Sequence, residues 1–162
     1  VCAGCYALKG NYARYPEIKK AQYKRLASIS RPDWVKAMAV VINSKAVAQH
    51  GYFRWHDAGD IQSPEHLQKI FEVCKLTPKV KHWMPTREAQ FLKDIDPAQV
   101  PDNLIIRMSS HMIDQGPVKF WPHTSTVGSS SRTCPAPDQA GKCGDCRSCW
   151  NKDIPNIEYG KH

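Results

Sequence analysis

The chain has 162 residues, of which 41% are hydrophobic and 23% charged, and it contains no apolar run approaching the roughly 20 residues of a membrane-spanning helix. This length suits one domain with a real hydrophobic core and is short for two. With a mean hydropathy of −0.53, it is expected to be soluble and to have no membrane partner. The chain starts with Val1 and a cysteine instead of an export signal, which favours the cytoplasm.

The formal net charge is +8, and much of the positive charge lies near the start of the chain. A basic surface favours partners that carry phosphate, so nucleic acid or a nucleotide is one expected partner class. The alternative is an ordinary solvated helix face. The basic residues concerned are Lys9, Arg14, Lys19, Lys20, Lys24, Arg25, Arg31 and Lys36.

Two helices are expected before residue 51. The segment 17–29, which follows Pro16, has the pattern of a basic amphipathic helix. A second, mostly apolar helix is expected to begin at Ser30 and to end near Gly51, because glycine commonly stops a helix.

Strands and helices then alternate from residue 52 to residue 114. The stretches "GYFRWHDAGD", "KVKHWMPTRE" and "DNLIIRMSSHMID" each predict a strand. Between them, "SPEHLQKIFEVCKL" predicts a helix with Ser63 as N-cap and Pro64 in the first position, and "REAQFLKDI" a helix capped by Thr86. The order βαβαβ predicts an α/β fold with a small parallel sheet, either open or part of a barrel.

The apolar periodicity disappears after Gln115, where Pro, Gly and Ser become frequent. A loop of this length is expected to be held in place by something, and metal ligation is a natural means. The sequence therefore predicts a single domain over residues 1–162, with a cysteine loop and helices in 1–51, a βαβαβ core in 52–114 and an irregular cluster-binding tail in 115–162.

Four of the seven cysteines lie in the tail with the spacing C-x8-C-x2-C-x2-C. Successive x2 intervals allow one short loop to wrap an iron–sulfur cluster, and a [4Fe–4S] cubane is the expected cofactor. Structural zinc is the alternative, with Cys2 and Cys5 joining two tail cysteines in a tetrahedral site. Cys74 is expected to be an inert core residue. The expected metal ligands are Cys2, Cys5, Cys134, Cys143, Cys146 and Cys149, the last four being the cluster ligands.

Ionisable residues follow the first and third predicted strands, where the crevice of a parallel sheet lies. The expected catalytic residues are His56, Asp57, Asp60 and His111, with a histidine as general base oriented by a carboxylate. The structural alternative is a hydrogen-bonded turn at the end of the first strand.

Other polar residues are expected to have structural places. His66 and His82 are expected at the surface or at helix ends, and Arg107 in the sheet as a partner for the carboxylates.

The stretches "CAGCYALKGNY", "FRWHDAGD", "HWMPTRE" and "CPAPDQAGKCGDCRSCW" together resemble a family of phage and bacterial proteins known as gene product 88-like, over nearly the whole chain. Members of that family are similar to radical SAM proteins, which implies a parallel partial barrel with a cluster loop after its first strand. That loop would be residues 2–6 here. The radical SAM motif is C-x3-C-x2-C, and this sequence has only Cys2-x2-Cys5.

Three hypotheses follow for function. The first is an iron–sulfur enzyme that hydrolyses small esters or amides, with a structural or Lewis-acidic cluster. The second is a basic, cluster-stapled nucleic-acid-binding protein without catalysis. The third, which depends on the resemblance, is a divergent radical SAM-like enzyme.

Overall fold

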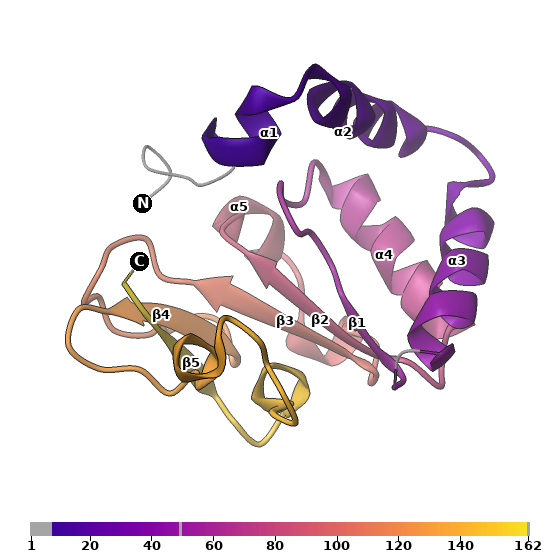
Figure 1. Ribbon diagram of the computed structural model, residues 1–162. Coiled ribbons are helices and arrows are strands. Elements are labelled where there is room, and N and C mark those ends of the chain that lie inside the picture. Colours follow the sequence, from indigo (N-terminus) through magenta and orange to yellow (C-terminus); the bar gives the residue numbers. More distant parts are fainter. Residues whose placement is uncertain (1–7, 49, 162) are drawn as a thin grey trace.

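The computed structural model describes residues 8–48 and 50–161. In the described residues, three helices precede the first strand, helices separate β1, β2 and β3, and β4 follows β3 directly (Figure 1). The helices are α1 (Gly10–Arg14), α2 (Pro16–Ser28), α3 (Trp34–Ala48), α4 (Pro64–Leu76) and α5 (Ala89–Leu92), with 3₁₀ turns η3 (Pro97–Gln99), η4 (Ala136–Gln139) and η5 (Ser148–Trp150). The strands are β1 (Tyr52–Arg54), β2 (Lys81–Thr86), β3 (Leu104–Ser109), β4 (Thr124–Gly128) and β5 (Asn156–Gly160).

The five strands form one parallel sheet in the sequential order β1-β2-β3-β4-β5. Each strand pairs with the next one along the chain, and the sheet curls into a half-barrel (Figure 1). This arrangement confirms the predicted α/β class with a partial barrel. All carboxyl ends of the strands meet at one edge, where polar residues from different strands come together.

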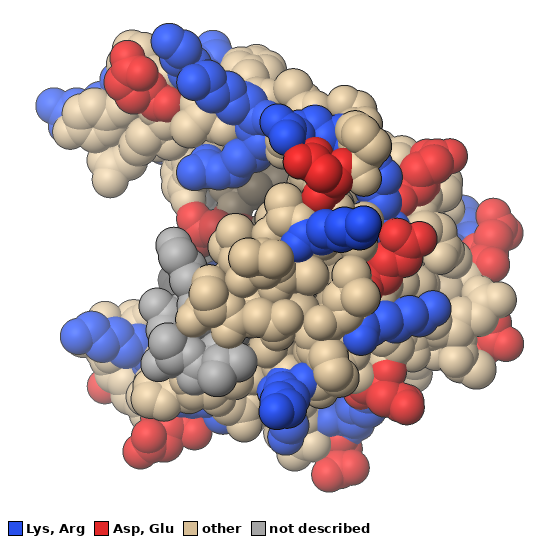
Figure 2. Space-filling model, turned by 90° about the vertical axis from the view of Figure 1, so that its right-hand side faces the viewer, with Lys and Arg blue, Asp and Glu red and all other residues tan. Residues whose placement is uncertain are grey.

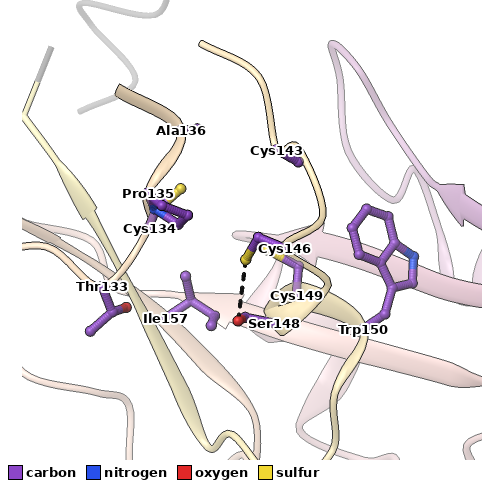
Figure 3. Close-up of a pocket in the computed structure, with 10 residues that line it drawn as sticks. All are labelled: Thr133, Cys134, Pro135, Ala136, Cys143, Cys146, Ser148, Cys149, Trp150 and Ile157. Carbon is purple, nitrogen blue, oxygen red and sulfur yellow. Dashed lines mark hydrogen bonds between the residues drawn. The ribbon is translucent and has the colours of Figure 1, made fainter. Parts of the chain in front are cut away.

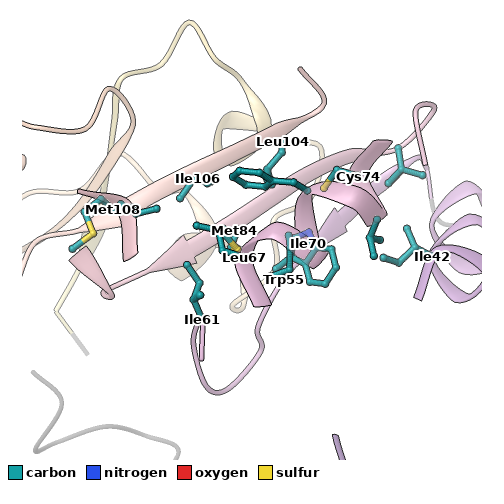
Figure 4. Packing of buried hydrophobic residues seen from close by; sticks show 14 of the residues in the cluster. Ile42, Trp55, Ile61, Leu67, Ile70, Cys74, Met84, Leu104, Ile106 and Met108 are labelled. Atoms are coloured by element: carbon teal, nitrogen blue, oxygen red, sulfur yellow. The ribbon is translucent and has the colours of Figure 1, made fainter. Parts of the chain in front are cut away.

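One face of the sheet is covered by α3 and α4 and holds the hydrophobic core (Figure 4). Because side chains alternate along a strand, Met84, Ile106 and Met108 point to this face, where they join Leu67 and Ile70 of α4 in one cluster. The helix α4 begins as its sequence predicts, since the Ser63 side chain accepts a hydrogen bond from the His66 amide at 3.1 Å.

The opposite face is covered by the tail. Trp150 packs its ring edge against Trp83 of β2 and Tyr52 of β1, with ring centroids 5.1 Å and 5.4 Å away. Its indole nitrogen also donates to the Phe53 carbonyl at 3.0 Å. The cysteine-rich turns between β4 and β5 therefore lie against the inside of the half-barrel.

The predicted irregular tail contains two strands that the sequence pattern does not reveal. β4 reads TSTVG, so its buried positions are hydroxyl residues instead of apolar ones. Its polar groups are satisfied by β5: Thr124 Oγ1 donates to Asn156 Oδ1 at 2.8 Å, and Asn156 Nδ2 donates to Thr126 Oγ1 at 3.0 Å. A strand whose buried face is hydrogen-bonded lacks the apolar alternation on which the prediction relied.

The second helix begins at Trp34, four residues after the predicted start. Ser30 and Arg31 belong to a turn, in which the Arg31 amide donates to the Ser28 carbonyl at 3.0 Å and the Arg31 guanidinium pairs with Asp33 at 2.7 Å. This turn connects α2 to α3 and changes the direction of the chain.

The helices α1 and α2 form an arm that stands off from the sheet. Neither helix has a buried residue, and Figure 2 shows Lys and Arg side chains along this arm above a hollow. A space of about 290 Å³ lies between the end of α2 and the start of α4, lined in part by Leu26, Gln62 and Lys69. No helix in the described part of the chain is long and apolar enough to span a membrane.

His66 and His82 are both buried: His66 lies in the first turn of α4, at a helix end as expected, whereas the expectation is wrong for His82, which lies in β2. Their exposed fractions are 4% and 0%. His82 lies on the core face of β2 between Trp55 and Thr77, where its ring nitrogens are 3.2 Å from Trp55 Nε1 and 2.8 Å from Thr77 Oγ1. His82 is buried because its place in β2 turns its side chain toward the core face. The amino-acid composition of the segment does not indicate which face the side chain takes.

Candidate metal centre

The four cysteines of the tail line one small cavity, of about 20 Å³, against the inner face of the sheet (Figure 3). In Figure 3, Cys134 lies across from Cys143, Cys146 and Cys149. Cys143 is exposed, whereas the other three are partly buried, and none of the four is in a disulfide. The predicted cluster ligands therefore come together, although they are up to fifteen positions apart in the sequence.

The backbone of the tail fixes this arrangement at two points. The amides of Thr133 and Cys134 both donate to the Glu158 carbonyl, at 2.9 Å and 3.0 Å, so Cys134 is attached to β5. The Cys146 amide donates to the Cys143 carbonyl at 3.0 Å, which closes the C-x2-C turn. Gly144 inside this turn has a φ of +54°, a conformation that glycine adopts without strain.

Two of the sulfur atoms have polar contacts. Cys149 Sγ is 3.4 Å from the hydroxyl of Tyr159 on β5, and Cys146 Sγ donates to Ser148 Oγ at 3.3 Å. Burial raises the pKa of the Cys149 thiol, whereas the hydrogen bond from Tyr159 and the charge of Arg107 act in the opposite direction. The site thus buries a thiol but also supplies groups that favour its thiolate.

Arg107 of β3 lies beneath the cysteine turns and is fully buried. Its guanidinium donates five hydrogen bonds, all to main-chain carbonyls and none to a carboxylate. The acceptors are the carbonyls of Cys149 at 3.1 Å, Thr124 at 3.4 Å, Ile154 at 3.0 Å, Ser148 at 3.1 Å and Asn151 at 3.0 Å. The expectation that it pairs with carboxylates is therefore wrong. An arginine inside the apolar run LIIRMS is the signal that would have marked it as unusual.

The donor set suits a metal–sulfur centre, because thiolates are the ligands of both iron–sulfur clusters and structural zinc. In the described residues, no three His, Cys, Asp or Glu side chains are already gathered closely enough to hold a metal ion. The cavity has room for about one water-sized group. A cubane would require the exposed turn around Cys143 to move outward.

A second polar group lies at the carboxyl edge of the sheet. Asp60 accepts hydrogen bonds from Thr86 Oγ1 at 2.6 Å and from the Arg87 amide at 2.7 Å, which ties the loop after β1 to the end of β2. Arg87 Nη2 in turn contacts the His111 carbonyl at 2.9 Å and His111 Nδ1 at 3.3 Å. Three strand ends are thereby joined, as expected from a parallel sheet.

The model of a family described as Gene product 88 matches residues 1–152. The chain belongs to this family. No curated protein and no solved structure matches it.

Membership of the Gene product 88 family confirms the predicted resemblance, whereas the similarity to radical SAM proteins stays a prediction. The loop that this similarity concerns, with Cys2 and Cys5, lies outside the described residues. Whether these two cysteines are ligands therefore also stays a prediction.

The remaining expected catalytic residues have different surroundings. His56 has a φ of +55°, and its Nδ1 is buried without a hydrogen-bond partner in the described part of the chain. Burial, with a smaller effect of Arg54, lowers the pKa of His56 to about 4, so its imidazole is neutral at pH 7. Asp57 accepts a hydrogen bond from Tyr12 of α1. Asp114, which follows β3, accepts one from the Ser129 amide at 2.7 Å.

Proposed function

We propose that this member of the Gene product 88 family binds an iron–sulfur cluster through Cys134, Cys143, Cys146 and Cys149, with structural zinc as the alternative. The observation that carries the proposal is that all four tail cysteines line one cavity. The x2 spacing of the last three favours a cluster over a zinc ribbon, which uses two separate C-x2-C pairs. The bound group would stabilise the segment between β4 and β5, whose only regular elements in the described residues are the short turns η4 and η5.

The test is metal and acid-labile sulfide analysis of the whole protein purified without oxygen, together with its absorption spectrum. About four iron and four sulfide per chain would support a cubane. Zinc without sulfide would replace the cluster by a structural site. Protein that binds neither iron nor zinc after reconstitution would refute both forms of the proposal.

Variants identify the ligands in the same assay. Cys146→Ser and Cys149→Ser are expected to lose the metal, since serine does not replace a thiolate. Cys74→Ala is the matched control, because Cys74 is a fully buried core thiol of α4. Equal metal content in all three variants would exclude Cys146 and Cys149 as ligands.

We also propose that the carboxyl edge hydrolyses small esters or amides. His56 is the general base in this proposal, because it follows β1 at this edge and its Nδ1 has no hydrogen-bond partner in the described residues, although a pKa of about 4 makes it a weak base. Arg87 supports it, since the hydrogen bonds that hold its side chain in the described residues use Nη2 alone. Its other N–H donors are available to an oxyanion.

His111 has a different part in this proposal. Because its Nδ1 faces the Arg87 N–H, the neutral ring carries its proton on Nε2 and acts as a hydrogen-bond donor. The probe is p-nitrophenyl acetate. His56→Ala is expected to abolish turnover without loss of metal, and His111→Ala to weaken it. Full activity of His56→Ala would remove this residue from the mechanism.

A further inference from the structure

The most unusual side chain in the structure is the guanidinium of Arg107. It is fully buried, and each of its nitrogens donates to at least one main-chain carbonyl. Three of the five acceptor carbonyls belong to residues 148–151 of the cysteine-bearing turn. These contacts fix η5 against β3. They also determine the position of Cys149, whose own carbonyl is one of the acceptors.

A buried cation normally requires a counter-charge. The ion pairs in the described residues are Arg31–Asp33, Arg132–Asp138 and Lys152–Asp102, all of them at the surface, and none involves Arg107. Arg107 Nε donates to the carbonyl of Cys149 itself and Nη2 to that of Ser148, so the guanidinium lies against the turn that carries the thiols of the cavity. Its natural counter-charge is therefore the thiolate side of the cysteine cavity.

Tyr159 contacts the same cysteine from β5, which is separated from β3 by β4 in the sheet. Its ring lies on β5, and its hydroxyl is 3.4 Å from Cys149 Sγ. A thiolate only accepts hydrogen bonds, so the phenol is the donor once Cys149 binds a metal. One sulfur atom thus has a hydrogen-bond donor on one strand and a buried positive charge on another.

We propose that Arg107 and Tyr159 are positioning residues for an anionic metal–thiolate centre: Arg107 supplies its buried counter-charge and fixes the turn, and Tyr159 donates a hydrogen bond to the Cys149 sulfur. Four thiolates around a zinc ion or a [4Fe–4S]²⁺ cluster carry net negative charge, whereas two disulfides would be neutral and would leave Arg107 uncompensated. This inference rests on the proposed metal centre.

The first test is Tyr159→Phe in the full-length, metal-loaded protein, with Tyr52→Phe as the control. Both variants lose one hydroxyl, but the ring of Tyr52 contacts Trp150, and no hydrogen bond joins Tyr52 to a sulfur atom within residues 8–48 and 50–161. The readout is the rate at which a chromogenic chelator removes the iron, or the zinc if zinc is the metal present. We expect release to be about 10- to 100-fold faster in Tyr159→Phe, the usual effect of losing a partner of a metal ligand.

A second readout separates an electronic effect on the centre from a general loss of stability. If iron is bound, loss of the Tyr159 donor is expected to make the reduction potential more negative, because hydrogen bonds to sulfur stabilise the reduced cluster. The Tyr52→Phe control should keep the wild-type potential. For zinc, the corresponding readout is the pH at which the metal is released, which should rise in Tyr159→Phe because the thiolate is then protonated more easily.

Arg107 is tested by comparing Arg107→Lys with Arg107→Met. Lysine keeps the charge but has three donors instead of five, and methionine removes both. We expect Arg107→Lys to retain metal better than Arg107→Met, with faster release than wild type. If Arg107→Met fails to fold, the Tyr159 comparison and Arg107→Lys still decide the matter.

The outcomes distinguish this inference from the proposal on which it depends. Wild-type protein that loads metal, with release and potential unchanged in Tyr159→Phe and release unchanged in Arg107→Lys, refutes the positioning roles alone. Wild-type protein that loads no metal refutes the metal centre and the positioning roles together.

Discussion

Replacement of His82 by Gln should reduce the sensitivity of the protein to acid. In the native state, Trp55 Nε1 donates to His82 Nδ1, and His82 Nε2 is paired with Thr77 Oγ1, which itself donates to the Val73 carbonyl at 2.8 Å. This order of donors requires neutral His82 with its proton on Nε2. A proton added at Nδ1 would face an indole N–H, which only donates.

The magnitude follows from the depressed pKa of His82, which burial lowers from 6.5 to about 4. The unfolded chain therefore binds this proton at a higher pH than the native state does. Stability from this residue is fully present above pH 6.5 and is lost as the pH falls towards 4. Over the interval from 6.5 to 5 the loss is about 2 kcal/mol, at 1.36 kcal/mol per unit.

The assay is urea unfolding of the wild type and of His82→Gln at pH 7 and at pH 5. His56 and His66 contribute acid sensitivity of the same sign, but they are present in both proteins and cancel in the difference. His123→Gln, at a half-buried position, is the control for removal of a histidine. If wild type and His82→Gln lose the same free energy between the two pH values, the reasoning about the neutral tautomer is wrong.

Three further predictions concern the core, the turn before Cys134 and the arm. Ile70→Ala removes most of a fully buried side chain of α4 and should lower the free energy of unfolding by about 2–5 kcal/mol. Ile70→Val should lower it by about 0.5–1.5 kcal/mol, and equal effects of the two variants in urea unfolding would contradict this prediction. Gly128→Ala would place a Cβ 2.5 Å from the Ser131 carbonyl oxygen, and so should reduce metal retention, whereas Gly116→Ala, with no atom within 4 Å, should not. A variant with glutamine at the four exposed basic positions of α2 should lose any binding to labelled single-stranded DNA, measured by fluorescence anisotropy. Binding of the wild type should weaken as salt is added. Binding that is insensitive to salt would exclude the basic arm as a nucleic-acid surface. These four positions are Lys19, Lys20, Lys24 and Arg25.

The βαβαβ core could be predicted from the sequence because its signals are local. Ser63 and Pro64 mark the start of α4, and the apolar runs in β2 and β3 mark buried strands. The strands β4 and β5 could not be found in this way, since Thr124 and Asn156 satisfy each other only after the strands have paired. That pairing is a contact between residues 32 positions apart.

The same distinction applies to the candidate site. The cysteine spacing is local, and the four tail cysteines line one cavity, whereas their role as ligands stays a prediction. The sequence did not indicate the surroundings of these cysteines, because Arg107 and Tyr159 belong to strands that reach the cavity only through the sheet. His56 and His111 also follow predicted strand ends, but the pairing of His111 with Arg87 depends on the register of β2 and β3.

The contact of Trp150 with β1 has a consequence for the order in which the protein is assembled. The indole N–H of Trp150 donates to the carbonyl of Phe53, which lies 97 positions earlier in the chain. Bringing these two residues together closes a long loop, and the loss of chain entropy opposes the stability that the contact adds. The cysteine turns therefore contact β1 and β2 only when distant parts of the chain have come together. If the proposed metal centre forms, a metal that arrives after this contact is made would meet cysteine turns already fixed beside Arg107 by its hydrogen bonds to the carbonyls of Ser148 and Cys149.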